Sequence, residues 1–148
     1  MIKSVSIKFF SKDNKYIIYP HLKIKGFVSI ASPPYFIDYN LSPSELLEKI
    51  LSMLEFSKEI EESPQDWKEF RAEYLKGIGL KTMKALHNGS ISFDVSVKDN
   101  VIIFTPWENK GLKEGFQGLG IDQNVSLPFN SSREELLKAL ELTLSRCK

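Results

Sequence analysis

The stretch from Ser90 to Thr105 constrains the fold more than any other part of the sequence. Apolar and polar residues alternate over 91–97, which is the period of two expected of a β-strand with one face buried and one in water. Asp99 and Asn100 then fit a two-residue turn, because both tolerate a positive φ. The run 101–105 is apolar, β-branched and aromatic throughout, so we expect a return strand covered on both faces. The segment predicts a β-hairpin.

A long loop is predicted to follow this hairpin. Pro106 cannot donate a hydrogen bond to a neighbouring strand, so the strand should end there. The glycine-rich run from Trp107 to Gly120 should then leave the sheet and form the working surface of the protein. In the hairpin itself, Phe93 and Phe104 should both be largely buried.

Further strands are predicted on either side of this region. Ser4–Phe10 and Tyr16–Tyr19 are separated by a polar turn cluster and predict a second hairpin, which Pro20 should end. Additional strands are predicted over 27–30 and 125–127. Together these segments predict an antiparallel or mixed sheet of five or six strands.

Capping patterns mark the first and the last helix. Ser42 is a good N-cap, Pro43 suits the first helical position, and Glu45 lies three residues after the serine, as in a capping box. The same spacing precedes the C-terminal helix twice, in Ser131 with Glu134 and in Ser132 with Glu135. The sequence leaves both of these pairs open as caps.

A middle helix is predicted to begin at Ser63-Pro64 and to end near Gly77 and Gly79. Its side chains at i, i+3 and i+7 should form one buried aromatic stripe, which consists of Trp67, Phe70 and Tyr74. A short helix over 81–86 should follow. We expect the first, middle and C-terminal helices to pack mainly on one face of the sheet.

The predicted fold class is therefore α+β, in a single domain over residues 1–148. A chain of 148 residues suits one hydrophobic core. The start of the sequence lacks the basic and apolar regions of a signal peptide, and its apolar runs are too short to span a bilayer. We therefore expect a cytoplasmic protein that makes no membrane contact.

The sequence predicts no catalytic residue, no metal site and no cofactor. Its two histidines, His21 and His87, lie near the ends of predicted elements and match no ligand or triad spacing. Cys147 is the single cysteine, and we expect an inert thiol. A small enzyme with His21 or His87 as its general base is the alternative.

Charge is distributed unevenly along the chain. The net charge of +1 gives no reason to expect direct nucleic-acid binding. Residues 44–74, however, contain nine acidic and four basic residues. The acidic residues could simply occupy solvated helix faces, or they could form a face that attracts a basic partner, with Glu59, Glu61 and Glu62 as candidates.

Two regions resemble a family of bacterial immunity proteins. The first is the run Thr105–Gly111, with Glu114-Gly115-Phe116 and Gly118-Leu119. The second comprises Trp67, Tyr74-Leu75, Lys81–Leu86 and Gly89. In both regions the chain is similar to the immunity proteins of contact-dependent growth inhibition (CDI) systems, the CdiI-type antitoxins. The resemblance carries no catalytic motif.

The resemblance implies a non-enzymatic protein that neutralises a cognate toxin by blocking its active site. Such toxins are commonly nucleases with basic clefts, so we expect a basic nuclease as partner and a monomer or weak dimer in solution. An orphan interaction module is a further alternative. The predicted loop supplies the candidate toxin-binding residues, which are Trp107, Glu108, Glu114, Phe116 and Asp122. Its two aromatic side chains could be interface hot spots or could fold back onto the core.

Overall fold

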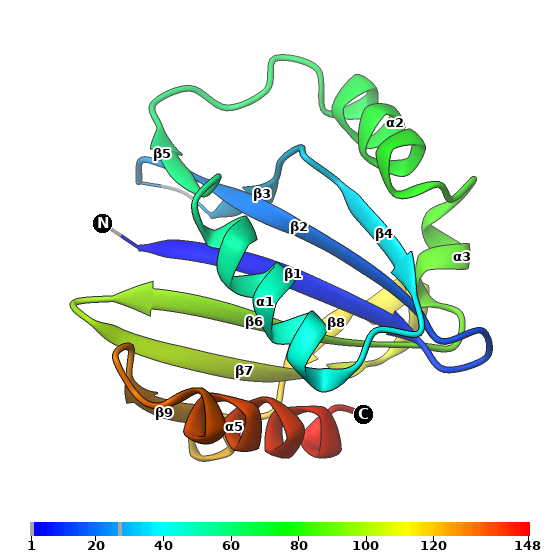
Figure 1. The fold of residues 1–148 in the computed structure, drawn as a ribbon. Coiled ribbons are helices and arrows are strands. Elements are labelled where there is room, and N and C mark those ends of the chain that lie inside the picture. The colour runs from blue at the N-terminus through cyan, green and yellow to red at the C-terminus, as the bar shows by residue number, and fades with distance from the viewer. Residues whose placement is uncertain (1, 27) are drawn as a thin grey trace.

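The computed structural model describes residues 2–26 and 28–148 and shows a curled β-sheet flanked by helices (Figure 1). Within these residues the nine strands are β1 (Lys3–Phe10), β2 (Lys15–Ile24), β3 (Ser29–Ala31), β4 (Phe36–Tyr39), β5 (Lys58–Ile60), β6 (Ser90–Lys98), β7 (Val101–Asn109), β8 (Phe116–Gly118) and β9 (Val125–Pro128). The helices are α1 (Pro43–Leu54), α2 (Trp67–Ile78), α3 (Met83–His87), α4 (Gly111–Glu114) and α5 (Arg133–Arg146), with a 3-10 turn, η1 (Ile121–Gln123). The predicted α+β class is confirmed.

Four long strands form the centre of the sheet, in the order β2-β1-β6-β7. The predicted central hairpin is β6 and β7, in which Val95 lies opposite Phe104 and the turn residues Asp99 and Asn100 both have positive φ. The other predicted strands correspond to β1, β2, β3 and β9, although Phe27 of the predicted segment 27–30 lies outside the described residues. The structure adds the short strands β4, β5 and β8. All pairings are antiparallel except that of β5 with β2.

Both prolines that were expected to end strands lie inside strands instead. β2 continues past Pro20 to Ile24, and β7 continues past Pro106 to Asn109. Each proline lies where its strand changes neighbours, since β2 pairs with β4 up to residue 18 and with β3 from residue 21. In the same way, β7 pairs with β9 up to residue 104 and with β8 from residue 107. A missing N–H at such a junction removes no ladder hydrogen bond.

One face of the sheet packs against α1 and α5 around the main core (Figure 1). Phe93 and Phe104 are fully buried there, as predicted. The expected burial of both faces over 101–105 is wrong, because burial alternates along β7 and Val101 is 38% exposed. No described helix covers the opposite face of β7 at this point, where Thr105 lines an open cavity.

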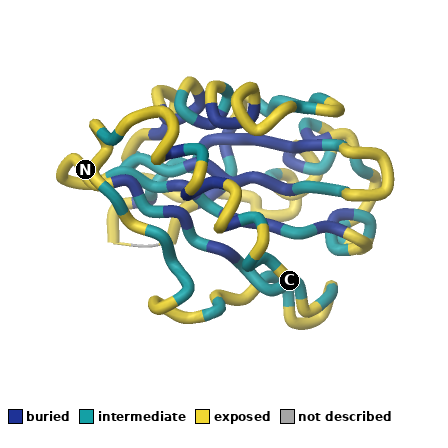
Figure 2. Tube along the Cα trace, turned by 60° about the horizontal axis from the view of Figure 1, so that its bottom comes forward, coloured by how far each residue is buried: buried dark blue, intermediate teal, exposed yellow. Residues whose placement is uncertain are grey.

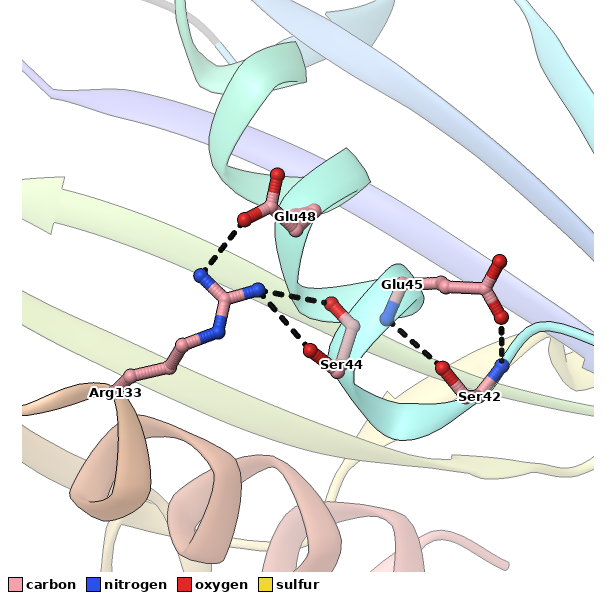
Figure 3. Close-up of polar contacts among 5 residues, drawn as sticks. All are labelled: Ser42, Ser44, Glu45, Glu48 and Arg133. Atoms are coloured by element: carbon pink, nitrogen blue, oxygen red, sulfur yellow. Dashed lines mark hydrogen bonds and ion pairs between the residues drawn. The ribbon is translucent and has the colours of Figure 1, made fainter.

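Polar contacts join the two helices of this layer (Figure 3). Arg133 of α5 forms an ion pair of 2.7 Å with Glu48 of α1 and donates to the hydroxyl of Ser44 at 3.1 Å. The predicted capping box of Ser42 and Glu45 is present at the start of α1. Of the two open possibilities for α5, the structure has Ser132 with Glu135.

The middle helix, α2, packs on the opposite face rather than beside α1 and α5. Its Tyr74 and Ile78 join Ile17 and Tyr19 of β2 in a second, smaller core. The neighbouring β2 residues Tyr16 and Ile18 face the main core, so β2 is apolar on both faces and requires helices on both sides. Figure 2 shows the resulting concentration of buried residues along the central strands, with exposed residues at the hairpin ends.

The start of α2 also differs from the prediction. The N-cap is Asp66, whose carboxylate accepts from the backbone of Lys68 and Glu69, and not Ser63. The helix ends at Gly79 in the left-handed conformation, as predicted. Trp67, expected in the core, is 51% exposed because it lies in the first turn of α2, beyond the edge of the second core.

Candidate functional site

Part of the sheet face that carries α2 is left open and polar. We call it the polar face and define it by Lys8, His21, Asp94, Thr105 and Trp107. These side chains line two adjoining cavities of about 170 and 330 Å³, which have His21, Asp94 and Trp107 in common. The polar residues that alternate with the core residues of β1 and β6 form the floor. The period of two in the sequence therefore places this surface opposite the main core.

Lys8 is the most unusual residue of the polar face, because it is only 7% exposed. Its ammonium donates to the hydroxyls of Ser6 and Ser92, at 3.1 and 2.7 Å. Among the described residues, no carboxylate lies within ion-pair distance of it. Burial lowers the pKa of Lys8, and the nearby charge of Asp94 opposes this effect.

The aromatic ring of Phe116 completes the surroundings of this lysine. The ammonium lies 4.4 Å from the centroid of the ring. The same ring stacks with the imidazole of His87, with 4.8 Å between the centroids. A cation–π contact is strongest where water is excluded, as it is around Lys8. Lys8 and His87 therefore hold Phe116 against the sheet.

Phe116 belongs to a folded segment, residues 107–124, which we call the arm. The sequence predicted a long loop here, whereas the structure has the end of β7 paired with β8, followed by η1. Asn109 braces the arm, because its side-chain amide donates to the carbonyls of His87 and Ser90, at 2.7 and 2.8 Å. Its side-chain oxygen accepts from the backbone of Gly111 at 3.0 Å. One side chain thus connects the arm to α3 and β6.

The C-terminal residues brace the arm from the other side. The backbone of Lys148 donates to the carbonyl of Trp107 at 3.1 Å and accepts from the N–H of Asn109 at 2.8 Å. Arg146 of α5 donates to the carbonyl of Gln123 at 2.8 Å. The arm is therefore a structured projection and not a flexible loop.

The predicted toxin-binding residues all lie on the arm, but they differ in exposure. Trp107 and Phe116 are half-buried, so both fold back towards the polar face. Glu114 and Asp122 are exposed, while Glu108 is half-buried, with its carboxylate 3.9 Å from the ammonium of Lys110.

Sequence reasoning missed the two most exposed apolar side chains of the arm. Leu112 in α4 is 53% exposed and Ile121 in η1 is 90% exposed. Each follows a glycine within a polar segment, and this sequence pattern could have indicated an exposed apolar side chain.

The other candidate surface leads into α2. Glu59 lies in β5, and Glu61 and Glu62 follow it directly. All three are exposed. Their segment ends at the N-terminus of α2, where an apolar cavity of about 240 Å³ opens. Ala31, Trp67, Phe70, Arg71, Tyr74 and Met83 line this cavity.

Comparisons with known proteins identify the family. The sequence profile described as "CdiI: CDI immunity protein" matches residues 3–147. The chain belongs to the CDI immunity protein family. A comparison with curated protein sequences found no match.

Solved structures share the fold of this family member. A chain of the "CdiA-CT/CdiI toxin and immunity complex from Yersinia pseudotuberculosis" has a TM-score of 0.76 and 20% identity, and the match covers 100% of this chain and 98% of that chain. The "Protein of Unknown Function NMB0488 from Neisseria meningitidis" has a TM-score of 0.69 and 19% identity, with 100% and 96% covered. At these identities the likeness concerns the fold alone.

Membership of the CDI immunity family favours binding over catalysis. The remaining titratable groups have the following surroundings. Burial lowers the pKa of His21, whose Nδ1 lies 2.8 Å from the hydroxyl of Ser4. The thiol of Cys147 donates to the carbonyls of Ser92 and Thr143, and burial raises its pKa to about 11. Over residues 2–26 and 28–148, no three metal-binding side chains come together. No helix in the same ranges is long and apolar enough to cross a membrane.

Proposed function

We propose that this CDI immunity protein binds a cognate toxin in the cytoplasm and neutralises it by covering the toxin's active site. The observation that carries the proposal is the family match over residues 3–147. The solved toxin and immunity complex of similar fold supports a protein partner. We further propose that the toxin is a nuclease with a basic substrate cleft, because an acidic, rigid surface can compete with nucleic acid for such a cleft.

The arm is the docking surface we favour. Glu108, Glu114 and Asp122 supply its negative charge, which two lysines of the same segment, at positions 110 and 113, reduce to a net of −1. Leu112 and Ile121 supply exposed apolar area. Asn109 and Lys148 hold the arm in place. A projection that is already ordered loses little conformational entropy on binding, and this favours high affinity. The half-buried rings of Trp107 and Phe116 would then form the base of the contact.

The experiment measures residual nuclease activity of the toxin domain at increasing concentrations of this protein. We expect full inhibition near one equivalent. In the variant Glu108→Lys with Glu114→Lys, toxin binding should weaken severalfold or more, mainly through faster dissociation, because two favourable charge contacts become repulsive. The melting temperature should change little, since a partly exposed pair 3.9 Å apart, such as Glu108 and Lys110, contributes little to stability.

A matched control reverses the same number of charges elsewhere. Glu134→Lys with Glu141→Lys changes two exposed positions of α5, on the other face of the sheet, and should leave inhibition unchanged. The rival surface is tested by reversing Glu59, Glu61 and Glu62. Normal binding by the arm variant, together with failure of this triple variant, would reject the arm and keep the immunity function. A wild-type protein that inhibits no nuclease toxin would reject the nuclease assignment.

A further inference from the structure

We propose that the cavity of α2 is the anchor pocket of the toxin interface and takes an apolar side chain flanked by lysine or arginine residues. This inference rests on the proposed function and adds a second contact to the arm. It concerns the cavity of about 240 Å³ between β3, α2 and α3.

Aromatic side chains of α2 form the walls of the cavity. Trp67 is 51% exposed at its mouth and lies edge-on to Phe70, with 5.7 Å between the ring centroids. Tyr74 forms the inner wall, fixed by a hydrogen bond of 2.8 Å between its hydroxyl and that of Tyr19. An exposed tryptophan beside a firm apolar pocket is the composition found at interface hot spots.

The charge around the cavity selects the chemistry of the occupant. Glu61, Glu62 and Asp66 lie in the segment that precedes Trp67 in the sequence. The carboxylate of Asp66 caps α2, whereas those of Glu61 and Glu62 do not. Glu69 and Glu73 of α2 add negative charge, while Lys68 and Arg71 of the same helix oppose it, so residues 61–74 hold five acidic and two basic side chains. Arg71 is the charged residue among those lining the pocket. An apolar side chain with basic neighbours therefore meets an apolar pocket and an acidic approach. Basic residues of this kind are also expected at the rim of a basic nuclease cleft.

The cavity and the arm lie close enough for one partner to cover both. Met83 at the start of α3 lines the cavity, and His87 at its end stacks on Phe116 of the arm. Four residues of helix separate them by about 6 Å along the axis. A standard interface buries about 800 Å² on each partner, which is ample for both features. The cavity and the arm then form two contacts of a single docking face.

The test compares Trp67→Ala with Phe129→Ala. Phe129 is a matched control because it is 40% exposed and lies after β9, away from α2. Binding is measured by calorimetry with the toxin domain inactivated by substitution in its active site. Trp67→Ala should weaken binding at least about tenfold, while Phe129→Ala should change it less than about twofold. Both variants should keep the wild-type melting temperature.

A fluorescence titration gives a second readout. In a Trp107→Phe background the emission comes from Trp67, and adding the toxin domain should shift it to shorter wavelength as water leaves the ring. The pocket assignment would be overturned if Trp67→Ala bound the toxin domain as tightly as the wild type does, or if the emission did not shift on binding. The proposed function would still stand in that case, provided that the wild type inhibits the toxin. A wild-type protein that binds no toxin domain would instead refute the proposed function itself.

Discussion

At the scale of single residues, Phe104 shows how the central hairpin determines stability. Phe104 belongs to β7 and is fully buried in the main core, which β6 and the helices α1 and α5 share. Phe104→Ala should lower the free energy of unfolding by about 3–5 kcal/mol, because it leaves a cavity in a packed core. Val101→Ala, three residues nearer the hairpin tip, on the opposite face of β7 and 38% exposed, should cost much less. A denaturant titration that finds a loss below about 1 kcal/mol for Phe104→Ala would contradict this role.

Lys8 has the opposite relation to stability. Its ammonium is buried without a carboxylate partner among the described residues, so Lys8→Met should leave the free energy of unfolding unchanged or raise it. The same substitution removes the cation–π contact with Phe116, so the arm should open more often. We expect faster amide hydrogen exchange over residues 110–122 and no change in β6.

The pH dependence of this effect has a definite sign. The pKa of Lys8 is lowered in the folded protein, so the unfolded chain holds more protons than the folded one between that lowered value and the ordinary 10.5. In this window the wild type gains stability as the pH rises, and any advantage of Lys8→Met should shrink. Urea titrations of both proteins at pH 7 and pH 10 measure the difference. An advantage that grows with pH would contradict the burial of a charged lysine.

At the scale of elements, the tyrosine pair Tyr19 and Tyr74 connects β2 with α2. Burial raises the pKa of Tyr19 to about 12 and also raises that of Tyr74. Between pH 10 and 12 the unfolded chain loses these phenolic protons while the folded chain keeps them, so stability should fall as the pH rises through this range. Tyr19→Phe with Tyr74→Phe should reduce the fall, as measured by the urea midpoint at pH 9 and pH 11. An identical fall in this variant would assign the alkaline sensitivity to other groups.

Local patterns predicted those elements whose neighbours lie close in the sequence. The alternation of β6, the turn at Asp99-Asn100 and the box at Ser42 each depend on a few adjacent residues, and all three are confirmed. Pro20 and Pro106 were misread because their effect depends on which strand pairs at that position, and this is decided by distant residues. The same limit applies to Trp67, whose periodicity fits a core that begins only two helical turns further on, at Tyr74.

The candidate surfaces show a similar division. The sequence identified the glycine-rich segment after β7, because glycines and charges near two aromatics mark an exposed region. It could not show that Asn109 folds this segment into an arm, since that depends on carbonyls of His87 and Ser90. Nor could it place the cavity of α2 and the arm at the two ends of α3.

At the scale of the whole molecule, the order of the strands has a consequence for aggregation. The long strands β1, β2, β6 and β7 are all flanked by partners, and the strands at the margins of the sheet, such as β3, β4, β8 and β9, have only three or four residues each. Short margins offer little template for a second chain to add to the sheet. We therefore expect copies of the protein to stay separate at high concentration rather than to join edge to edge.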